Sequence, residues 1–178
     1  MSNVVIVVDM LNGFLKEGKL ANPGARWVIP NIVDLLQRKV HEDWKVIFVA
    51  DNHVEGDLEF LMFPEHCVRG TEETLIIDEL RKFRNDYNYV PKTRYSAFFR
   101  TSLESILENE NPQEVIVVGI YADICVLYTA ADLRNRNYKV TIPKDCTVTL
   151  AGIDDRVIFD HMKNVLGVNI VDSQEKIR

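Results

Sequence analysis

Short apolar runs constrain the fold of this chain more than any other feature of its sequence. Val4–Val8 reads VVIVV and Glu114–Gly119 reads EVIVVG, so neither run alternates polar with apolar side chains. A strand with one face in water would alternate, and these runs therefore predict strands that are buried on both faces. Such strands are typical of a parallel sheet whose two faces are both covered by helices.

Amphipathic segments separate the apolar runs along the chain. The pattern predicts further strands at Lys45–Ala50, Asn88–Val90, Tyr138–Ile142 and Val168–Val171. It predicts helices at Trp27–Val40, Thr71–Phe83, Thr101–Leu107, Ala122–Arg136 and Ile153–Leu166. The predicted fold class is α/β, with three α/β/α layers and a mainly parallel six-stranded sheet.

Length, charge and cysteine content limit the kinds of protein that fit. A chain of 178 residues is typical of one domain, which we expect to span residues 1–178. The net charge of −6 and the scattered basic residues argue against a nucleic-acid partner, and no apolar run reaches the ~18 residues of a membrane span. Three widely spaced cysteines and the lack of a signal-peptide pattern favour a reducing, cytoplasmic location.

Chemically capable side chains follow four of the predicted strands. They are Asp9, Asp51, Lys92 and Cys125. Each has an ordinary alternative role, as a helix cap, a solvated charge or a small buried residue. Because ligands bind at the carboxyl ends of the strands in open parallel sheets, their coincidence at one sheet edge favours a functional site.

Cys125 occupies a position that suits a nucleophile. It follows the strand at Glu114–Gly119 and begins the helix predicted after it. A helix start offers unpaired backbone N–H groups and a partial positive charge, and both favour a thiolate over a thiol. The local pattern therefore predicts a reactive cysteine.

Five segments of the chain, taken in their order and spacing, resemble those of isochorismatase-like cysteine hydrolases. Within that superfamily they are most similar to nicotinamidases, also called pyrazinamidases. The segments are Val7–Phe14 (VVDMLNGF), Asp51–His53 (DNH), Phe63–Thr71 (FPEHCVRGT), Lys92–Phe98 (KTRYSAF) and Gly119–Val126 (GIYADICV). The resemblance runs roughly from Val4 to Val171 and implies the Rossmann-like fold of that superfamily.

The resemblance implies a catalytic triad of Asp9, Lys92 and Cys125. Asp9 would take the proton of the Cys125 thiol, while Lys92 would hold Asp9 and favour the charged state. The thiolate would attack the amide carbonyl of nicotinamide, and water would hydrolyse the resulting thioester. The products would be nicotinate and ammonia, which would place the reaction in NAD salvage.

The resemblance also implies an oxyanion hole built from two backbone N–H groups, which fall on Tyr121 and Cys125. Relatives carry a non-proline cis peptide before the first donor, here the Ile120–Tyr121 bond, and a plain trans turn at Gly119 is the alternative. The pair Tyr121-Ala122 departs from the commoner Ala-Thr pair. A backbone donor survives this change, although the larger ring alters the pocket.

A second group of residues suits a metal ion. Asp51 and His53 stand two apart at a strand end, and His66 from the following loop completes the set. A carboxylate with imidazoles suits one divalent transition metal, with zinc favoured over iron or manganese. The resemblance implies that this metal binds the pyridine nitrogen. It also implies a fourth ligand in some relatives, for which Glu59 is the candidate and Glu55 and Asp57 are the rivals.

The substrate predicted by the resemblance is a small ring amide, with Phe14, Phe63 and Tyr95 as apolar walls. Ordinary core packing is the alternative role for these three aromatic residues. A related amidohydrolase acting on a carbamoyl or ureido substrate with the same triad is the alternative function, and such relatives generally lack the metal set. A non-enzymatic domain of the same fold would show neither activity nor metal. The oligomeric state stays open, since relatives often self-associate.

Overall fold

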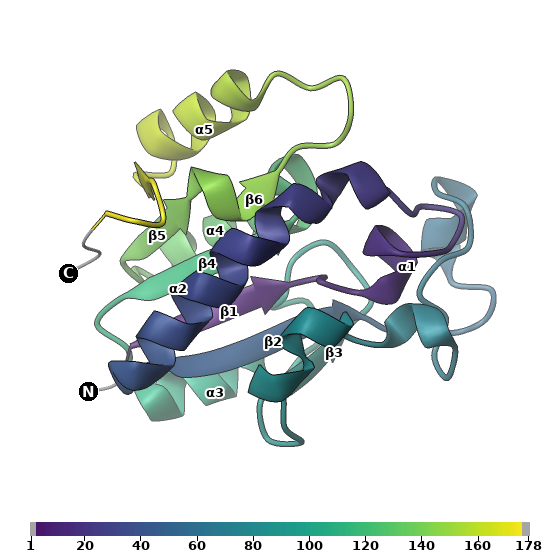
Figure 1. Ribbon diagram of the computed structural model, residues 1–178, viewed down its shortest axis with the longest axis horizontal. Coiled ribbons are helices and arrows are strands. Elements are labelled where there is room, and N and C mark those ends of the chain that lie inside the picture. Colours follow the sequence, from purple (N-terminus) through teal and green to yellow (C-terminus); the bar gives the residue numbers. More distant parts are fainter. Residues whose placement is uncertain (1–2, 176–178) are drawn as a thin grey trace.

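The apolar run Val4–Val8 forms strand β1 in the middle of a parallel sheet, in a computed structural model that describes residues 3–175 (Figure 1). The strand order is β3-β2-β1-β4-β5-β7. The other strands are β2 (Lys45–Asp51), β3 (Tyr89–Lys92), β4 (Val115–Ile120), β5 (Val140–Pro143), β6 (Thr147–Val148) and β7 (Asn169–Val171). The sheet therefore has one strand more than the six predicted, because the two-residue β6 pairs with the end of β4 beyond β5.

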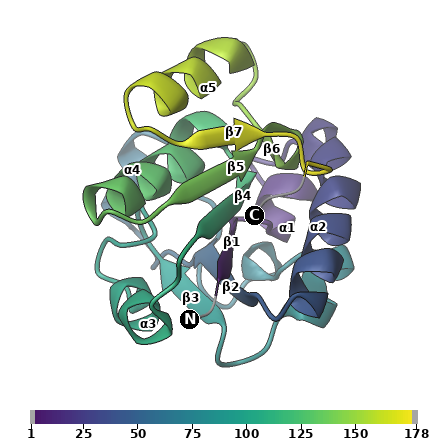
Figure 2. The ribbon, with the colours of Figure 1, turned by 90° about the vertical axis from the view of Figure 1, so that its left-hand side faces the viewer.

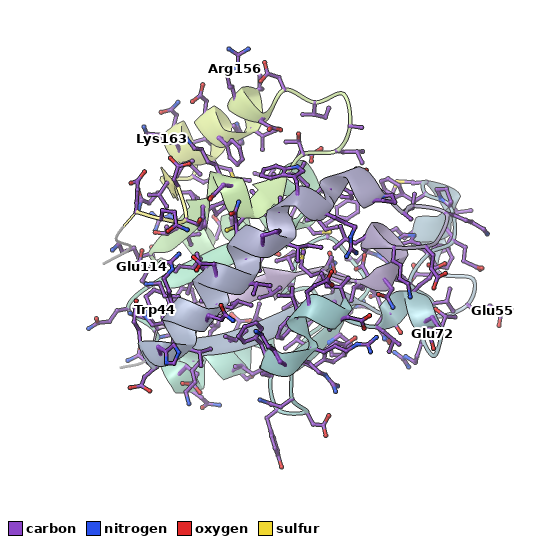
Figure 3. All side chains as sticks on the ribbon, in the orientation of Figure 1. Trp44, Glu55, Glu72, Glu114, Arg156 and Lys163 are labelled. Atoms are coloured by element: carbon purple, nitrogen blue, oxygen red, sulfur yellow. The ribbon has the colours of Figure 1, made fainter. Side chains whose placement is uncertain are left out.

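Helices cover both faces of this sheet, which confirms the three-layer α/β/α class (Figure 2). On one face lie α1 (Asn12–Leu15) and α2 (Ile29–His41), and on the other lie α3 (Leu103–Glu110) and α4 (Leu127–Asn135). Helix α5 (Asp155–Asn164) lies beside β7, and its Arg156 and Lys163 point away from the sheet (Figure 3). Among residues 3–175, no helix combines the length and the apolar character needed to cross a bilayer.

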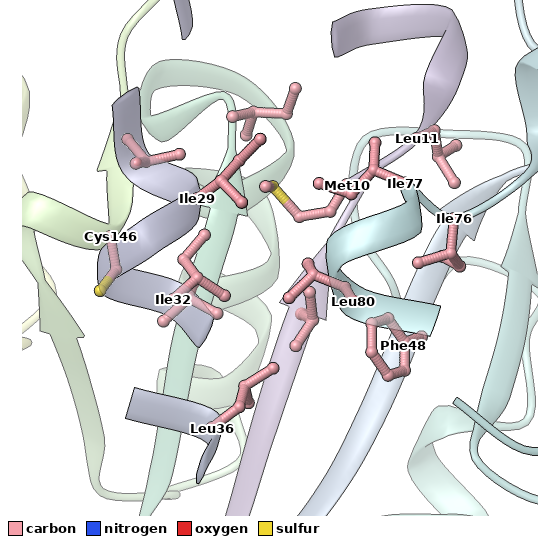
Figure 4. Packing of buried hydrophobic residues seen from close by; sticks show 14 of the residues in the cluster. Met10, Leu11, Ile29, Ile32, Leu36, Phe48, Ile76, Ile77, Leu80 and Cys146 are labelled. Atoms are coloured by element: carbon pink, nitrogen blue, oxygen red, sulfur yellow. The ribbon is translucent and has the colours of Figure 1, made fainter. Parts of the chain in front are cut away.

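The side chains of β1 show why both faces need a cover. Val5 and Val7 pack into the core on the α2 side, whereas Val4, Ile6 and Val8 pack into the core on the α3 and α4 side. All five residues are fully buried. On the α2 side, the apolar face of that helix meets the sheet and a neighbouring turn (Figure 4), through Ile29, Ile32, Leu36, Met10, Phe48 and Leu80.

The single helix predicted at Thr71–Phe83 is wrong. The segment instead forms two separate 3-10 turns, at Glu72–Thr74 and Asp78–Phe83. Between them the backbone is extended and bonds to the segment after β1, since the Asn12 N–H donates to the Leu75 carbonyl and the Ile77 N–H to that of Met10. These backbone hydrogen bonds to another part of the chain override the local helical pattern.

The chain also departs from simple helices elsewhere. The helix predicted at Ala122–Arg136 begins as a π-turn at Ala122–Val126 and becomes α4 only from Leu127. Several short elements have no predicted counterpart. They are α1, β6 and the 3-10 turns at Pro23–Val28, Leu58–Leu61 and Lys144–Cys146. Single-turn π segments are frequent at functional sites, and this one carries Cys125.

Gly119 near the end of β4 is a position where no other residue fits. Its φ is +114°, and a Cβ atom there would lie 2.0 Å from the carbonyl oxygen of Val8 on β1. We expect Gly119→Ala to lower the free energy of unfolding by roughly 2–4 kcal/mol, because rigid backbone must move to admit the methyl group. Chemical denaturation measures this change.

Gly70→Ala is the matched control. Gly70 also has a positive φ, of +83°, but nothing lies within 4 Å of its hypothetical Cβ. Gly70→Ala should lower the free energy of unfolding by only ~1–2 kcal/mol, which is the cost of placing an alanine in the left-handed region. Equal losses in the two variants would show that the contact with Val8 does not matter.

Candidate active site

Four strands end close together, and each delivers one reactive side chain. Asp9 follows β1, Asp51 and Lys92 end β2 and β3 as paired neighbours in the sheet, and Cys125 follows β4. The Nζ atom of Lys92 lies 2.8 Å from Asp9 Oδ2, 2.5 Å from Asp51 Oδ1 and 3.5 Å from Cys125 Sγ. The structure thus brings the three residues of the predicted triad together, around a buried lysine.

Asp9 has an unusual backbone that aids this arrangement. Its φ is +51°, in the left-handed region that non-glycine residues rarely adopt. Its N–H donates to the Val49 carbonyl at 2.9 Å, and its Oδ1 accepts the N–H of Asp51 at 2.9 Å. Strained backbone of this kind clusters at functional sites, and no sequence pattern had indicated it here.

Burial governs the ionisation of the cluster. It raises the pKa of the Cys125 thiol well above its usual range, with a smaller opposing effect from the Lys92 charge. Burial also raises the pKa of Asp9 to about 6, helped by the charge of Asp51 and opposed by Lys92. For Lys92 itself burial acts downwards, but the charges of Asp51 and Asp9 outweigh it and raise the pKa.

The resting state near pH 7 is therefore a neutral thiol beside an Asp9 carboxylate and a Lys92 ammonium. Desolvation of Cys125 within the π-turn thus outweighs the effect of a helix start, which favours a thiolate. A carboxylate oxygen of Asp9 lies within 4.8 Å of Cys125 Sγ. A proton acceptor for the sulfur therefore lies within the same buried cluster.

The turn between β4 and α4 carries the two residues expected to form an oxyanion hole. The Ile120–Tyr121 peptide bond is cis, as the resemblance implied, and the alternative of a plain trans turn is wrong. Tyr121 and Cys125 both line the same cavity. The Tyr121 side chain is buried and meets the Phe14 ring edge-on, with ring centroids 6.3 Å apart.

The three residues predicted to bind a metal also lie together. One ligand atom each from Asp51, His53 and His66 falls within 4.8 Å of the other two. Asp51 Oδ2 lies 3.7 Å from Nε2 of each histidine, which is too long for a hydrogen bond. All three residues are at most 3% exposed.

The surroundings of these residues fit a divalent metal ion. Both Nδ1 atoms have partners, at 3.2 Å from Asp57 Oδ2 for His53 and at 2.8 Å from the Pro64 carbonyl for His66. The Nε2 atom of His53 is buried without a hydrogen-bond partner. Two imidazoles held through Nδ1, with Nε2 facing a buried carboxylate, are the arrangement expected of metal-binding histidines.

The three candidates for a fourth metal ligand differ in burial and in what their carboxylates face. Glu59 is 5% exposed, its Oε1 lies 4.0 Å from His66 Nε2, and its Oε2 is buried without a hydrogen bond. Asp57 instead faces the far nitrogen of His53, and Glu55 is exposed. The geometry therefore favours Glu59 among the three.

A cavity of about 280 Å³ joins the two groups of residues. This is close to the lower end of the ~300–1,000 Å³ range of ligand pockets, and so suits a small ligand. Phe14, Phe63 and Tyr95 line it, together with Asp9, Asp51, Glu59, His66 and Cys125. Leu20, Ile120, Ile124 and Leu150 also line it, and no sequence pattern had indicated them as cavity walls. Among residues 3–175, no lysine or arginine lines this cavity.

Comparisons with known proteins agree on the family. A family model described as an isochorismatase domain matches residues 3–175. The nicotinamidase of Saccharomyces cerevisiae is 28% identical over 94% of this chain and 98% of its own length. Solved structures include nicotinamidase from Bacillus subtilis (TM-score 0.87, 30% identity, 97% and 100% of the two chains covered) and N-carbamoylsarcosine amidase from Thermoplasma acidophilum (TM-score 0.88, 30% identity, both chains fully covered).

Proposed function

Because the chain belongs to the isochorismatase family, we propose that it is a metal-dependent nicotinamidase that hydrolyses nicotinamide to nicotinate and ammonia. One observation carries the proposal. Lys92 contacts Asp9 and Cys125 of the proposed triad and also Asp51 of the proposed metal ligands. The nucleophile and the metal ligands therefore belong to one buried cluster. That cluster opens into an apolar cavity with aromatic walls, which suits a flat heteroaromatic amide.

The first half of the reaction uses the triad. Asp9 accepts the Cys125 proton as Sγ forms a bond to the amide carbonyl carbon, and the Lys92 ammonium stabilises the sulfur as it gains negative charge. The carbonyl oxygen becomes an oxyanion, for which the Tyr121 and Cys125 backbone N–H groups are the proposed donors. Asp9 then returns the proton to the amide nitrogen, the C–N bond breaks, ammonia leaves and a thioester remains.

The second half regenerates the enzyme. A water molecule gives a proton to Asp9 and attacks the thioester carbonyl, and the same backbone donors stabilise the second oxyanion. The C–S bond breaks, the proton on Asp9 returns to Cys125, and nicotinate is released. An Asp9 pKa of about 6 suits a residue that gains and loses a proton in each half.

Asp51, His53 and His66, with Glu59, would hold the metal. When bound, such an ion supplies a Lewis-acid site that suits the ring nitrogen of nicotinamide. Phe14, Phe63 and Tyr95 bound the space between this set and Cys125, and would sandwich the ring.

A carbamoyl or ureido substrate is the second candidate, and the likeness to N-carbamoylsarcosine amidase favours it. N-carbamoylsarcosine carries a carboxylate, which needs a cationic partner in a buried pocket. In the part of the chain that the structure describes, no lysine or arginine lines the cavity, and the lining residues Asp9, Asp51 and Glu59 are acidic. We therefore place nicotinamide first.

Ammonia release across a small panel of amides tests this order. We expect kcat/KM for nicotinamide and pyrazinamide to exceed that for N-carbamoylsarcosine and ureidoacrylate by at least ~100-fold, with zinc supplied. Preference for an anionic carbamoyl substrate would select the second candidate. No turnover of any amide, with or without metal, would contradict both.

We further propose that the enzyme acts in NAD salvage in the cytoplasm, and that residues 1–178 form a single domain.

A further inference from the structure

Asp57 makes three contacts that connect the residues around the metal-type site. Its Oδ2 lies 3.2 Å from Nδ1 of His53. Its Oδ1 accepts the backbone N–H of Glu59 at 2.9 Å and Nη1 of Arg94 at 2.8 Å. The Asp57 side chain is only 6% exposed. A buried carboxylate therefore links one proposed ligand, the backbone of another, and an arginine from a different segment.

The contact with His53 has a defined chemical effect. A neutral imidazole carries one N–H, and an ionised carboxylate can only accept a hydrogen bond. Asp57 therefore favours the proton on Nδ1 of His53, which leaves the Nε2 lone pair free. Nε2 is the buried atom without a hydrogen-bond partner, 3.7 Å from Asp51 Oδ2.

Arg94 completes the arrangement by offsetting charge. Its Nη1 lies 2.8 Å from Asp57 and 3.9 Å from Oε2 of Glu59, so one cation serves two neighbouring carboxylates. Without it these two buried carboxylates would repel each other. Because Arg94 comes two residues after Lys92, it also ties this loop to the end of β3.

We propose that Asp57 and Arg94 form an outer clamp that presents His53 Nε2 and the Glu59 carboxylate to a bound metal ion. Asp57 is then a positioning residue and not a ligand. The clamp rests on the proposed metal-dependent function, and it explains why this acid lies so close to the site yet faces the far nitrogen of His53.

Zinc affinity, measured by competition with a chromophoric chelator, tests the clamp. Asp57→Ala in the full chain should weaken zinc binding by ~10–100-fold, as loss of an outer partner does elsewhere, while still binding one ion per chain. Arg94→Met should also weaken zinc binding, by a smaller factor. Glu55→Gln is the matched control, because Glu55 is exposed, points outward (Figure 3) and changes the net charge equally. It should bind zinc like the unaltered chain.

A spectroscopic readout separates positioning from general damage. In the zinc-loaded protein, ¹H–¹⁵N NMR should show protected Nδ1–H protons on both His53 and His66. Asp57→Ala should remove the His53 signal and keep that of His66, whose partner is the Pro64 carbonyl. If Asp57→Ala is unfolded in thermal melts, Arg94→Met, at a side chain 36% exposed, carries the same affinity test.

Three results would overturn the clamp. Unchanged zinc affinity in Asp57→Ala and Arg94→Met would do so while leaving the nicotinamidase proposal intact. Loss of the bound ion from an Asp57→Ala chain that still melts like the unaltered chain would make Asp57 a ligand instead. An unaltered chain that hydrolyses nicotinamide without binding zinc would remove both the clamp and the metal dependence.

Discussion

Cys125→Ala is expected to lower kcat for nicotinamide hydrolysis by roughly 10⁴-fold or more, as loss of a covalent nucleophile does in other hydrolases. The structure gives the reason, since Cys125 lines the cavity with its Sγ 3.5 Å from Lys92 Nζ and within 4.8 Å of an Asp9 oxygen. Ammonia release measures the loss. Nicotinamide should still bind, because the cavity walls do not change.

Cys146→Ala is the control for this prediction. Cys146 is also a fully buried free cysteine, but it packs in the core on the α2 side (Figure 4) and is not among the residues that line the cavity. It should lower stability by roughly 1 kcal/mol and leave kcat within about twofold. Turnover by Cys125→Ala near the level of the unaltered enzyme would reject Cys125 as the nucleophile.

Removal of the metal is expected to have the second-largest effect. A chelator should reduce kcat/KM for nicotinamide by at least ~100-fold, and added zinc should restore it, because two buried histidines and Asp51 then lack the cation that their arrangement suits. His66→Ala should lose both the ion and its rescue by zinc. Metal analysis alongside the assay measures both effects.

His161→Ala is the matched histidine control, since His161 is exposed on α5. It should keep one ion per chain and full activity. Zinc should also raise the melting temperature of the unaltered chain by binding the folded state, and not that of His66→Ala. Full activity after complete stripping would contradict the metal dependence.

The strand ends were the most predictable part of the site. An apolar run followed at once by Asp9 or Asp51 indicates both the strand and the edge where its next side chain emerges. The α/β class followed from the same runs, because only a doubly covered sheet buries them. Asp51 and Lys92 lie side by side because their strands, β2 and β3, pair in the sheet and follow one another along the chain.

The loops were much less predictable, for a physical reason. The extended backbone at Leu75 and Ile77 depends on partners near β1 that local periodicity does not reveal. The same holds for the contact of Asp57 with His53, made through an irregular turn. The sequence also did not show that burial raises the pKa of Cys125, because the depth of a side chain depends on the packing around it.

Asp51 divides its two oxygens between the two halves of the site. Oδ1 accepts Lys92, and Oδ2 faces both imidazoles. If a homologue lost metal binding during evolution, both histidines could therefore be replaced by other residues. An acidic residue would still be needed at this position to neutralise the buried ammonium of Lys92. We expect ion-free members of the family to retain this aspartate after its imidazole companions have gone, so its presence alone says little about metal dependence.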